Sequence, residues 1–590
     1  GGNPKNITKI YDQFDDNTLA QVNYAGWLSE AGGEAPPVTL LGSVLLTDAD
    51  GSEQLNFASG NTLYAYVEDV DRNTSETTSE SITIAIVSET DATGESVTLS
   101  ETGINTGIFM GSMSFSEASA VDGDGILQVT RGDKLTGSYT DPADDYGNES
   151  TVTDVAYYDM TLVSDTLSTD ATWALSSSPF LVTGDVTVPD GVTLTIEPGV
   201  EVRFMPGSDD QGTNNAYSSE FRIAGSLVAV GTESDSITFV SNADSPTEQD
   251  WSGITSFDPH VIHLSYVSFR HAYRVFGGSS IVVSGEASDS LRITHSTFRD
   301  ISDHIFDMNI EIYSGGRCLI QDNRFDGFEK FFGSYSSVRL LGDGSLLKIH
   351  GNDFVDCANA LTYREIRIDE LGPRVIFTNN QSNSNSKLSF SALGENPTED
   401  QVIIRDNHLV GQYVYLGGSE GTQGRYLFKG NTLDQCYMNV YATEKALIQD
   451  NKIQGGYIGI ELNSANAVIE RDTLINNSSG GIRVYTDFYR SETIKDTIRY
   501  CVITGNGSSD DNAGIKIDDY GNAVIHNNNI YDNNTYDIRN NSPHHDLDAR
   551  FNWWGETTTA EMDLGGNPKN ITKIYDQFDD NTLAQVNYAG

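Results

Sequence analysis

The chain has 590 residues, with 35 lysines and arginines against 85 aspartates and glutamates, which gives a formal net charge of −50. A chain of this length is too long for one compact hydrophobic core, so at least two domains are expected. The strong negative charge repels nucleic acid and anionic lipid, which excludes both as partners. No apolar run in the sequence approaches the roughly 20 residues needed to span a bilayer, so membrane insertion is not expected.

One segment occurs twice without a single change, as Gly1–Gly26 and as Gly565–Gly590. We call this segment the terminal repeat. Because duplicated domains usually drift apart in sequence, the identity indicates one period, with overlap, of a longer tandem array. Residues 1–26 are then the tail of a preceding unit, and residues 27–37, rich in Gly and Pro, form a linker. The predicted partner is an adjacent repeat unit, bound head to tail.

Residues 38–165 contain short stretches in which apolar and polar residues alternate between acidic turns. Examples are Thr62–Val67, Ser81–Val87 and Ser96–Leu99. About seven such strands predict an N-terminal antiparallel, Ig-like β-sandwich. The stretch Leu99–Phe109 resembles a motif of β-sandwich modules in giant tandem-repeat prokaryotic surface proteins, and the resemblance implies a place at the cell surface.

Two acidic clusters in these turns are candidate metal ligands. Calcium takes six to eight oxygen ligands, and alternate residues of one loop can curl around a single ion. Calcium is therefore the one cofactor that the sequence predicts, with solvated turn acids as the alternative reading. The candidate ligands are Asp69, Asp71, Asn73, Asp141, Asp144 and Asp145.

Residues 166–556 have a different period. Val186–Phe204 resembles the opening coil of a right-handed parallel β-helix, and after it a polar residue followed two positions later by an apolar one recurs every 20 to 29 residues. This spacing matches one turn of a β-solenoid and predicts about 15 coils. An Asn at such a corner can hydrogen-bond the turn backbone and the Asn of the next coil. The polar members are Ser296, Asn323, Asn352, Asn380, Asn407, Asn431, Asn451, Asp472, Cys501, Asn528 and Asn552.

The end of this region carries a second resemblance. Phe551–Gly555 resembles the last coil of many β-helix domains, and together with the recurring corner it makes residues 166–556 similar to the pectin-lyase-like superfamily. The resemblance implies a right-handed parallel β-helix, so the predicted fold is all-β. An uncapped end of parallel strands invites association. Residues 557–590, which include the second terminal repeat, are therefore expected to cap the solenoid.

The four cysteines lie far apart in the sequence, which argues against a disulfide framework or a zinc site. Cys357 and Cys436 fall in one column three coils apart, roughly 14 Å by strand spacing, which is beyond disulfide reach. They are expected to be reduced and buried, with an oxidised pair as the alternative. The four are Cys318, Cys357, Cys436 and Cys501.

A column of polar residues is predicted on the outer face of the β-helix. When the coils are aligned on their short strands, five outward residues stack at roughly 4.8 Å intervals. In pectin-lyase-like enzymes such faces carry uronate-binding residues, so the resemblance implies an extracellular polysaccharide as ligand. The alternative is a surface charge ladder neutralised by Asp487, Asp518 and Asp519. The predicted column is Tyr441, Glu461, Arg483, Lys516 and Arg539.

The sequence gives little support for an enzyme. Phe257–His260 resembles a catalytic tetrapeptide of β-helix epimerases, but four residues are a short match and the sequence favours an Asp-Pro turn there. Paired acids such as Asp510–Asp511 are adjacent, so in a strand they point to opposite faces. The sequence therefore predicts a non-enzymatic, secreted repeat unit that assembles end to end into an extracellular or cell-surface filament. The alternatives are a glycan-binding adhesin and a polysaccharide lyase, hydrolase or epimerase.

Overall fold

The computed structural model describes residues 39–208, 218–257, 259–284, 291–328, 330–332, 338–356, 366–368, 374–383, 387–392, 400–417, 424–490, 494–509 and 511–589. The chain divides into two compact units. One comprises residues 1–162 and 177–180, and the other comprises residues 163–176 and 181–590. The first terminal repeat, the linker and Cys357 lie outside the described residues.

The N-terminal unit is built from strands whose apolar residues alternate with exposed ones. Among the described residues it forms one nine-stranded sheet in the order β1-β3-β6-β5-β4-β8-β9-β2, with β7 paired to β6. The pairings are antiparallel except β2–β9 and β6–β7, which are parallel. The elements are β1 (Ser43–Thr47), β2 (Asn56–Phe57), β3 (Thr62–Glu68), η1 (Val70–Arg72), β4 (Ser81–Ser88), β5 (Glu95–Glu101), β6 (Ile108–Ser116), β7 (Ile126–Gln128), β8 (Lys134–Asp141) and β9 (Ser150–Tyr158).

The two ends of this sheet meet around a single core. The Leu46 amide of β1 donates to Asp154 Oδ2 of β9 at 2.6 Å. Leu63, Leu99 and Leu135, from three other strands, are fully buried in the same cluster. The antiparallel β-domain thus encloses a shared apolar interior. Its assignment as an Ig-like sandwich stays a prediction.

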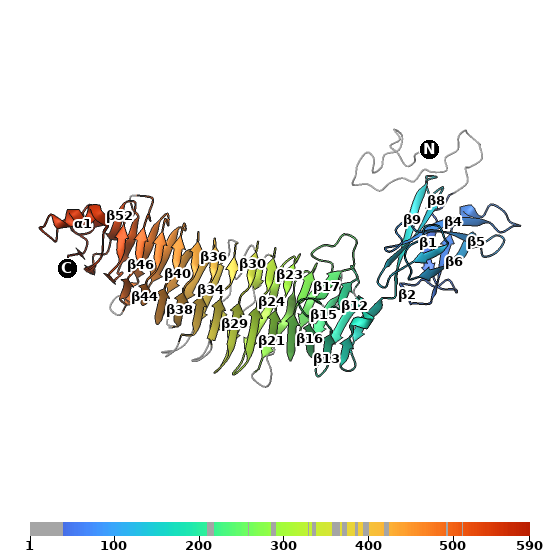
Figure 1. Cartoon of the computed structure of the whole chain (residues 1–590), viewed down its shortest axis with the longest axis horizontal. Coiled ribbons are helices and arrows are strands. Elements are labelled where there is room, and N and C mark those ends of the chain that lie inside the picture. The colour runs from blue at the N-terminus through green and yellow to red at the C-terminus, as the bar shows by residue number, and fades with distance from the viewer. Residues whose placement is uncertain are drawn as a thin grey trace. The chain divides into compact units, whose positions relative to one another are not determined.

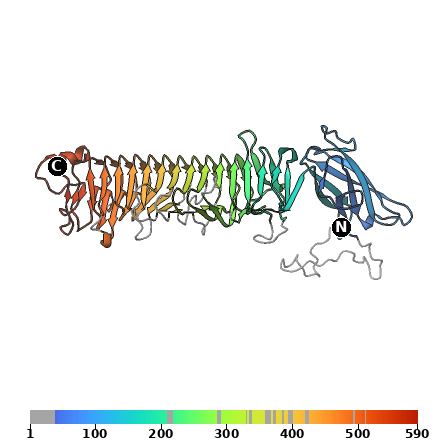
Figure 2. The same ribbon diagram turned by 90° about the horizontal axis from the view of Figure 1, so that it is seen from below.

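The second unit is a parallel β-helix, and Figures 1 and 2 show its strands stacked coil upon coil. One face is a 16-stranded parallel sheet in the described part of the chain. Its strands are β11 (Ala171–Trp173), β13 (Thr193–Ile196), β16 (Ser226–Val230), β19 (Val261–Ser265), β22 (Leu291–Thr294), β25 (Arg317–Gln321), β29 (Leu346–His350), β32 (Arg374–Thr378), β35 (Val402–Arg405), β38 (Arg425–Lys429), β41 (Lys445–Gln449), β44 (Ala467–Glu470), β47 (Asp496–Arg499), β50 (Ala523–His526), β53 (Leu547–Asp548) and β55 (Val586–Asn587).

The second face consists of short strands that follow the first face after a sharp corner. It pairs in parallel from coil to coil, as in β42–β45 and β48–β51. Its strands are β14 (Glu201–Phe204), β17 (Ile237–Ser241), β20 (Val267–Arg270), β23 (Thr297–Arg299), β26 (Arg324–Asp326), β30 (Asp353–Val355), β33 (Gln381–Ser382), β36 (His408–Val410), β39 (Thr432–Asp434), β42 (Lys452–Gln454), β45 (Thr473–Ile475), β48 (Val502–Thr504) and β51 (Asn529–Tyr531).

The third face completes each coil and carries the longest strands. We call it the broad face. Its strands are β10 (Thr161–Thr166), β12 (Phe180–Val188), β15 (Glu220–Ile223), β18 (Gly253–Ser256), β21 (Phe276–Val283), β24 (His304–Ile312), β27 (Lys330–Phe332), β28 (Val338–Leu340), β31 (Ile366–Ile368), β34 (Lys387–Ala392), β37 (Tyr413–Gly417), β40 (Tyr437–Tyr441), β43 (Ile458–Asn463), β46 (Gly480–Thr486), β49 (Ala513–Asp519), β52 (Tyr536–Asn540) and β54 (Ile574–Tyr575). The helical elements of this unit are η2 (Leu175–Ser177), η3 (Phe488–Arg490) and α1 (Gly555–Asp563). Among the described residues there is no helix long and apolar enough to cross a membrane.

The interior of the β-helix is filled by like side chains stacked in register. Phe298, Phe325 and Phe354 occupy equivalent positions of β23, β26 and β30. Their rings stack with centroid separations of 5.1 and 5.3 Å, and all three are buried. Each buried ring contributes about 1.5–3 kcal/mol from burial, and each stacked pair adds about 0.5–1.5 kcal/mol.

The corner between the first two faces holds the predicted ladder of amides. Each ladder Asn donates through Nδ2 to Oδ1 of the next, over distances of 2.9–3.1 Å, and its Nδ2 also donates to a carbonyl of the preceding coil. Each Oδ1 also accepts the backbone N–H of the ladder residue before it. The continuous run is Asn323, Asn352, Asn380, Asn407, Asn431 and Asn451. The structure confirms the corner predicted from the sequence.

The residue before each ladder position has a left-handed backbone conformation. Asp322, Asp406 and Asp450, for example, have φ of 55°, 60° and 60°. This conformation turns the chain sharply between two strands, and Gly, Asn and Asp adopt it most readily. Bulky Tyr500 and Phe551 also adopt it, with φ of 60° and 64°, so the ladder holds a strained backbone there.

The ladder is interrupted where Asp472 and Cys501 replace Asn. Asp472 Oδ1 accepts from Nδ2 of Asn451 at 2.8 Å, but the buried Oδ2 makes no hydrogen bond. At the equivalent position, a ladder asparagine has its Nδ2 amide group, which donates a hydrogen bond to a carbonyl of the preceding coil. Burial raises the pKa of Asp472 from 3.8 to about 7. Three cysteines, Cys318, Cys436 and Cys501, are buried free thiols, as expected.

We predict that Asp472→Asn stabilises the β-helix. Because the folded state holds a proton that the unfolded chain releases above about pH 4, the contribution of Asp472 to wild-type stability falls as pH rises from about 4 to about 7 and is level above that. At pH 8 the variant should gain up to about 4 kcal/mol in the free energy of unfolding, and at pH 4 almost nothing. Urea unfolding at both pH values measures the gain. The exposed control Asp563→Asn should change neither midpoint, and a pH-independent effect of Asp472→Asn would contradict the prediction.

Candidate functional site

Four of the five predicted column residues stack on the broad face. Glu461 of β43 lies opposite Arg483 of β46, which lies opposite Lys516 of β49 and then Arg539 of β52. Each is preceded by a buried Ile, at 460, 482, 515 and 538. The alternation of inward apolar and outward polar residues is therefore as predicted.

Tyr441 does not belong to this column, which corrects the prediction. Asn439 lies opposite Glu461, and Tyr441 lies opposite Asn463 in the neighbouring row. The alignment on short strands placed β40 two residues out of register. A two-residue shift keeps every apolar residue facing inward, so the apolar pattern does not distinguish the two registers.

The cations of the column are paired with carboxylates. Arg483 Nε lies 2.8 Å from Asp518 Oδ2, and its Nη1 lies 3.5 Å from Glu461 Oε1. Asp511 bridges the other two cations, at 2.9 Å from Lys516 Nζ and 3.0 Å from Arg539 Nη2. The surface charge ladder that the sequence offered as an alternative is thus present, with Asp511 as a member that the sequence analysis missed.

Glu461 is the half-buried acid of this network. Burial raises the pKa of its carboxyl group, and Arg483 offsets part of that rise. The hydroxyl group of Tyr437 contacts Glu461 Oε2. Burial, aided by the negative charge of Glu461, also raises the pKa of Tyr413. The network therefore holds one carboxyl group that takes up a proton more readily than a carboxyl group in water.

Two cavities open on the strands that carry the column. The first has a volume of about 480 Å³ and is lined by Arg483, Lys516 and Asp511 together with Tyr457 and small polar residues at 478–479, 508–509 and 512. Its walls come from the loops before β46 and β49. Short runs of Asn and Ser mark those loops in the sequence, but they have no periodicity by which to recognise a binding wall.

The second cavity has a volume of about 590 Å³ and an aromatic lining. Tyr485, Phe488, Tyr489 and Tyr520 line it together with two carboxylates, those of Asp487 and Asp519. Phe488 and Tyr489 are 64% and 95% exposed, so their rings are accessible to a ligand. Charged groups in one cavity and flat apolar rings in the other can together bind a polyhydroxyl chain through hydrogen bonds and ring contacts.

Residues 437–546 match the family described as a right handed beta helix region. The matched segment contains the column strands from β40 to β52 and all the residues that line both cavities. It agrees with the right-handed β-helix predicted from the sequence. No curated protein matches the chain.

The acidic turns predicted to bind calcium are occupied by backbone hydrogen bonds. Asp71 Oδ2, Asp145 Oδ1 and Asp141 Oδ2 accept from the successive amides of residues 40, 41 and 42, at 2.8, 2.9 and 2.7 Å. The two predicted clusters therefore converge on one segment. Burial, with Asp141 and Asp71 nearby, raises the pKa of Asp69, while the Tyr139 hydroxyl, donating at 2.5 Å, partly lowers it.

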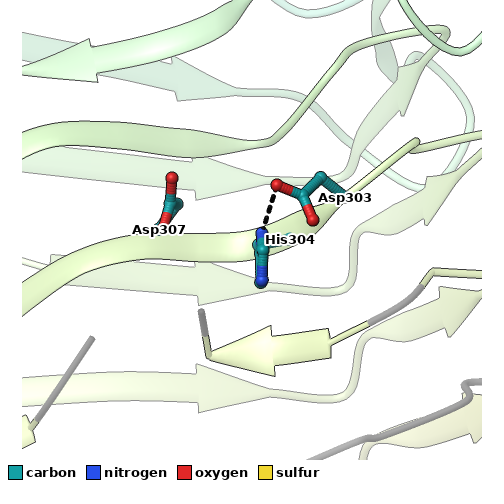
Figure 3. Close-up of side chains that lie close together, drawn as sticks. All are labelled: Asp303, His304 and Asp307. Atoms are coloured by element: carbon teal, nitrogen blue, oxygen red, sulfur yellow. Dashed lines mark ion pairs between the residues drawn. The ribbon is translucent and has the colours of Figure 1, made fainter. Parts of the chain in front are cut away.

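The remaining two candidates have local partners. Asp144 Oδ1 accepts from the amides of Tyr146 and Asn148, and Asn73 Nδ2 donates to Asn105 Oδ1 at 2.7 Å. Calcium at these turns stays a prediction. In the described ranges, the group of side chains at metal-ligand distances lies elsewhere, at Asp303, His304 and Asp307 (Figure 3). The sequence analysis did not select these residues, although a histidine between two aspartates marks them in the sequence.

We predict that Arg483→Met destabilises the β-helix by about 1–3 kcal/mol at pH 7, because Glu461 and Asp518, 15% and 13% exposed, lose their shared donor. The loss should be smaller at pH 5 than at pH 7, because the raised pKa means that more of the Glu461 carboxyl group is protonated at the lower pH. Urea midpoints at the two pH values measure this. Lys445→Met at the exposed start of β41 is the matched control, and equal losses at both pH values would refute the explanation.

Proposed function

We propose that the protein is a structural module of an extracellular or cell-surface filament, and that the terminal repeat joins successive modules end to end. The observation that supports the proposal is the position of residues 565–589. They add one strand to each of two faces at the C-terminal end of the β-helix. Without them, β52 and β53 would be open edges, which readily pair with other chains.

The two added strands continue the stacking of the coils. Ile574 of β54 lies opposite Ile538 of β52, and Val586 of β55 lies opposite Leu547 of β53. Ile574 and Val586 are buried. The main chain also crosses this boundary, with Leu547 N–H donating to the Gln585 carbonyl at 2.8 Å. The segment thus buries apolar surface and satisfies the backbone of the last coil.

A lysine fixes the segment at the corner of the last coil. Lys573 Nζ donates to the carbonyls of Asn533, Asn534 and Thr535 at 2.7, 3.1 and 3.3 Å. Arg539 of β52 stacks over the Tyr575 ring with its guanidinium carbon 4.2 Å from the centroid. These contacts are specific to the end surface, because they combine two cations, three carbonyls and an aromatic ring in fixed places.

The first terminal repeat carries the same chemistry. Lys9, Ile10 and Val22 are its counterparts of Lys573, Ile574 and Val586. An identical segment fits an identical acceptor, so residues 1–26 match the end surface of a neighbouring module. In a tandem array this places a capped β-helix end directly before each β-domain.

The test disables the intramolecular cap in the full chain. Ile574→Asp with Val586→Asp removes both apolar anchors from residues 565–590 while residues 1–26 stay intact. We expect head-to-tail oligomers, in which the first repeat of one molecule occupies the opened end of the next. Light scattering after size-exclusion chromatography measures the mass, and electron microscopy measures the axial period.

The chain provides its own control for this experiment. The same substitutions in the first copy, Ile10→Asp with Val22→Asp, should leave a monomer whose own cap is in place. All four substitutions together should abolish the ordered oligomers. Monomers at every concentration with only the second copy disabled would overturn the proposal.

The cavities favour a second candidate function, a glycan-binding adhesin. Arg483 of the first cavity and Tyr485 of the second lie two residues apart in β46, Lys516 lies on the adjacent strand β49, and Phe488 and Tyr489 lie in η3. Such a surface suits an acidic polysaccharide, with carboxylate groups at Arg483 and Lys516 and pyranose rings against Phe488 and Tyr489.

We predict that a uronate oligosaccharide binds the wild-type chain on a glycan array. Arg483→Ala with Lys516→Ala should weaken binding about tenfold or more, since each charged hydrogen bond contributes about 1.5–3 kcal/mol. Phe488→Ala with Tyr489→Ala should have a similar effect. Tyr500→Ala removes an exposed ring that lies away from both cavities, so it should leave glycan binding unchanged. An array without signal removes this candidate.

A further inference from the structure

We propose that Asp303, His304 and Asp307 form a binding site for a divalent transition-metal ion at the start of β24. The site is independent of the end-to-end assembly proposed above. One oxygen or nitrogen atom from each of the three side chains lies within 4.8 Å of the other two. Figure 3 shows the two carboxylates on either side of the imidazole edge that carries Nδ1.

The surroundings of the His304 imidazole point to a bound ion. The His304 side chain is only 9% exposed, and neither of its ring nitrogens makes a hydrogen bond. A buried polar atom without a partner costs about 1–3 kcal/mol. Nδ1 lies 2.6 Å from Asp303 Oδ2, although the oxygen is not in the direction in which an N–H group would donate. Two lone pairs at this separation repel each other, and a cation bound to both atoms offsets that repulsion.

The backbone of the preceding coil holds the ligands in place. The Asp303 amide donates to the Tyr273 carbonyl at 2.9 Å, and the His304 carbonyl accepts from the Val275 amide at 3.0 Å. The pairing of β21 with β24 shifts its register between Gly277 and Ser280, immediately after Gly277 pairs with Asp307. The extra residue of this irregularity lies in β21, so Asp307 sits where the pairing of the two strands is interrupted.

Arg274 orients the third ligand and sets the charge. Its Nη1 lies 3.1 Å from Asp307 Oδ2, which leaves Asp307 Oδ1 for the ion. Ligand carboxylates are commonly held by an outer hydrogen bond of this kind. Two carboxylates and one guanidinium leave a net charge of −1, so a divalent cation is balanced to within one charge.

The donor set indicates the class of metal. One imidazole nitrogen with two carboxylate oxygens suits Zn²⁺ or Co²⁺, whereas Ca²⁺ and Mg²⁺ take oxygen ligands. Three protein ligands leave at least one position for water. This distinguishes the site from the calcium predicted for the acidic turns of the N-terminal unit.

The test titrates the chelator-treated full chain with Co²⁺ and follows the visible d–d absorption and the heat of binding. We expect the wild type to bind one equivalent of Co²⁺, and this binding should depend on His304. His304→Gln and Asp303→Asn should each weaken it at least tenfold, and Zn²⁺ should raise the melting temperature of the wild type but not of either variant. His304→Gln removes a buried imidazole whose ring nitrogens make no hydrogen bond, so it should fold in the absence of metal, and circular dichroism checks this.

The chain offers a matched control in another His–Asp pair. His260 Nε2 lies 2.6 Å from Asp190 Oδ1, but both side chains are exposed, at 65% and 81%. His260→Gln should therefore leave the Co²⁺ spectrum and affinity unchanged. Absence of a bound equivalent in the wild type, or unchanged affinity in folded His304→Gln and Asp303→Asn, would overturn the proposal.

Discussion

The corner hydrogen-bond ladder is the interaction on which the β-helix depends. From Asn323 to Asn451, each coil turns through a left-handed residue and then presents an amide whose oxygen and nitrogen bond the coils on both sides. A turn with this backbone is strained for most residues, and its polar groups are buried. The amide satisfies them at every step, so the coils can stack in register and the apolar interior can form behind them.

The sequence predicts this corner well because its chemistry is narrow and its period is long. Asn407, Asn431 and Asn451 are recognisable from their spacing alone, and few residues other than Asn can donate and accept in the same stack. Register on the broad face is less constrained. Tyr441 was misplaced because Val440 packs inward equally well opposite Ile460 or Leu462, so only the observed pairing separates the two registers.

The candidate sites were harder to predict because they are formed by loops and irregular pairing. Ser478 and Ser509 line a cavity, but nothing periodic identifies them. Asp141 and Asp145 accept hydrogen bonds from the amides of residues 42 and 41, which are distant in the sequence, and no local pattern indicates these contacts. Asp303, His304 and Asp307 lie together beside an interruption of the β21–β24 pairing that no sequence pattern announces.

The stacking of coils has a consequence for how such a module changes in evolution. A cross-section through the ladder at Asn380 presents the same hydrogen-bonding surface as one at Asn407 or Asn431. If the segment between two such positions is deleted, or a further coil is inserted there, the coils on both sides can form equivalent contacts. The module can therefore change its length by whole coils while both of its ends keep their surfaces, so reach and attachment can evolve separately.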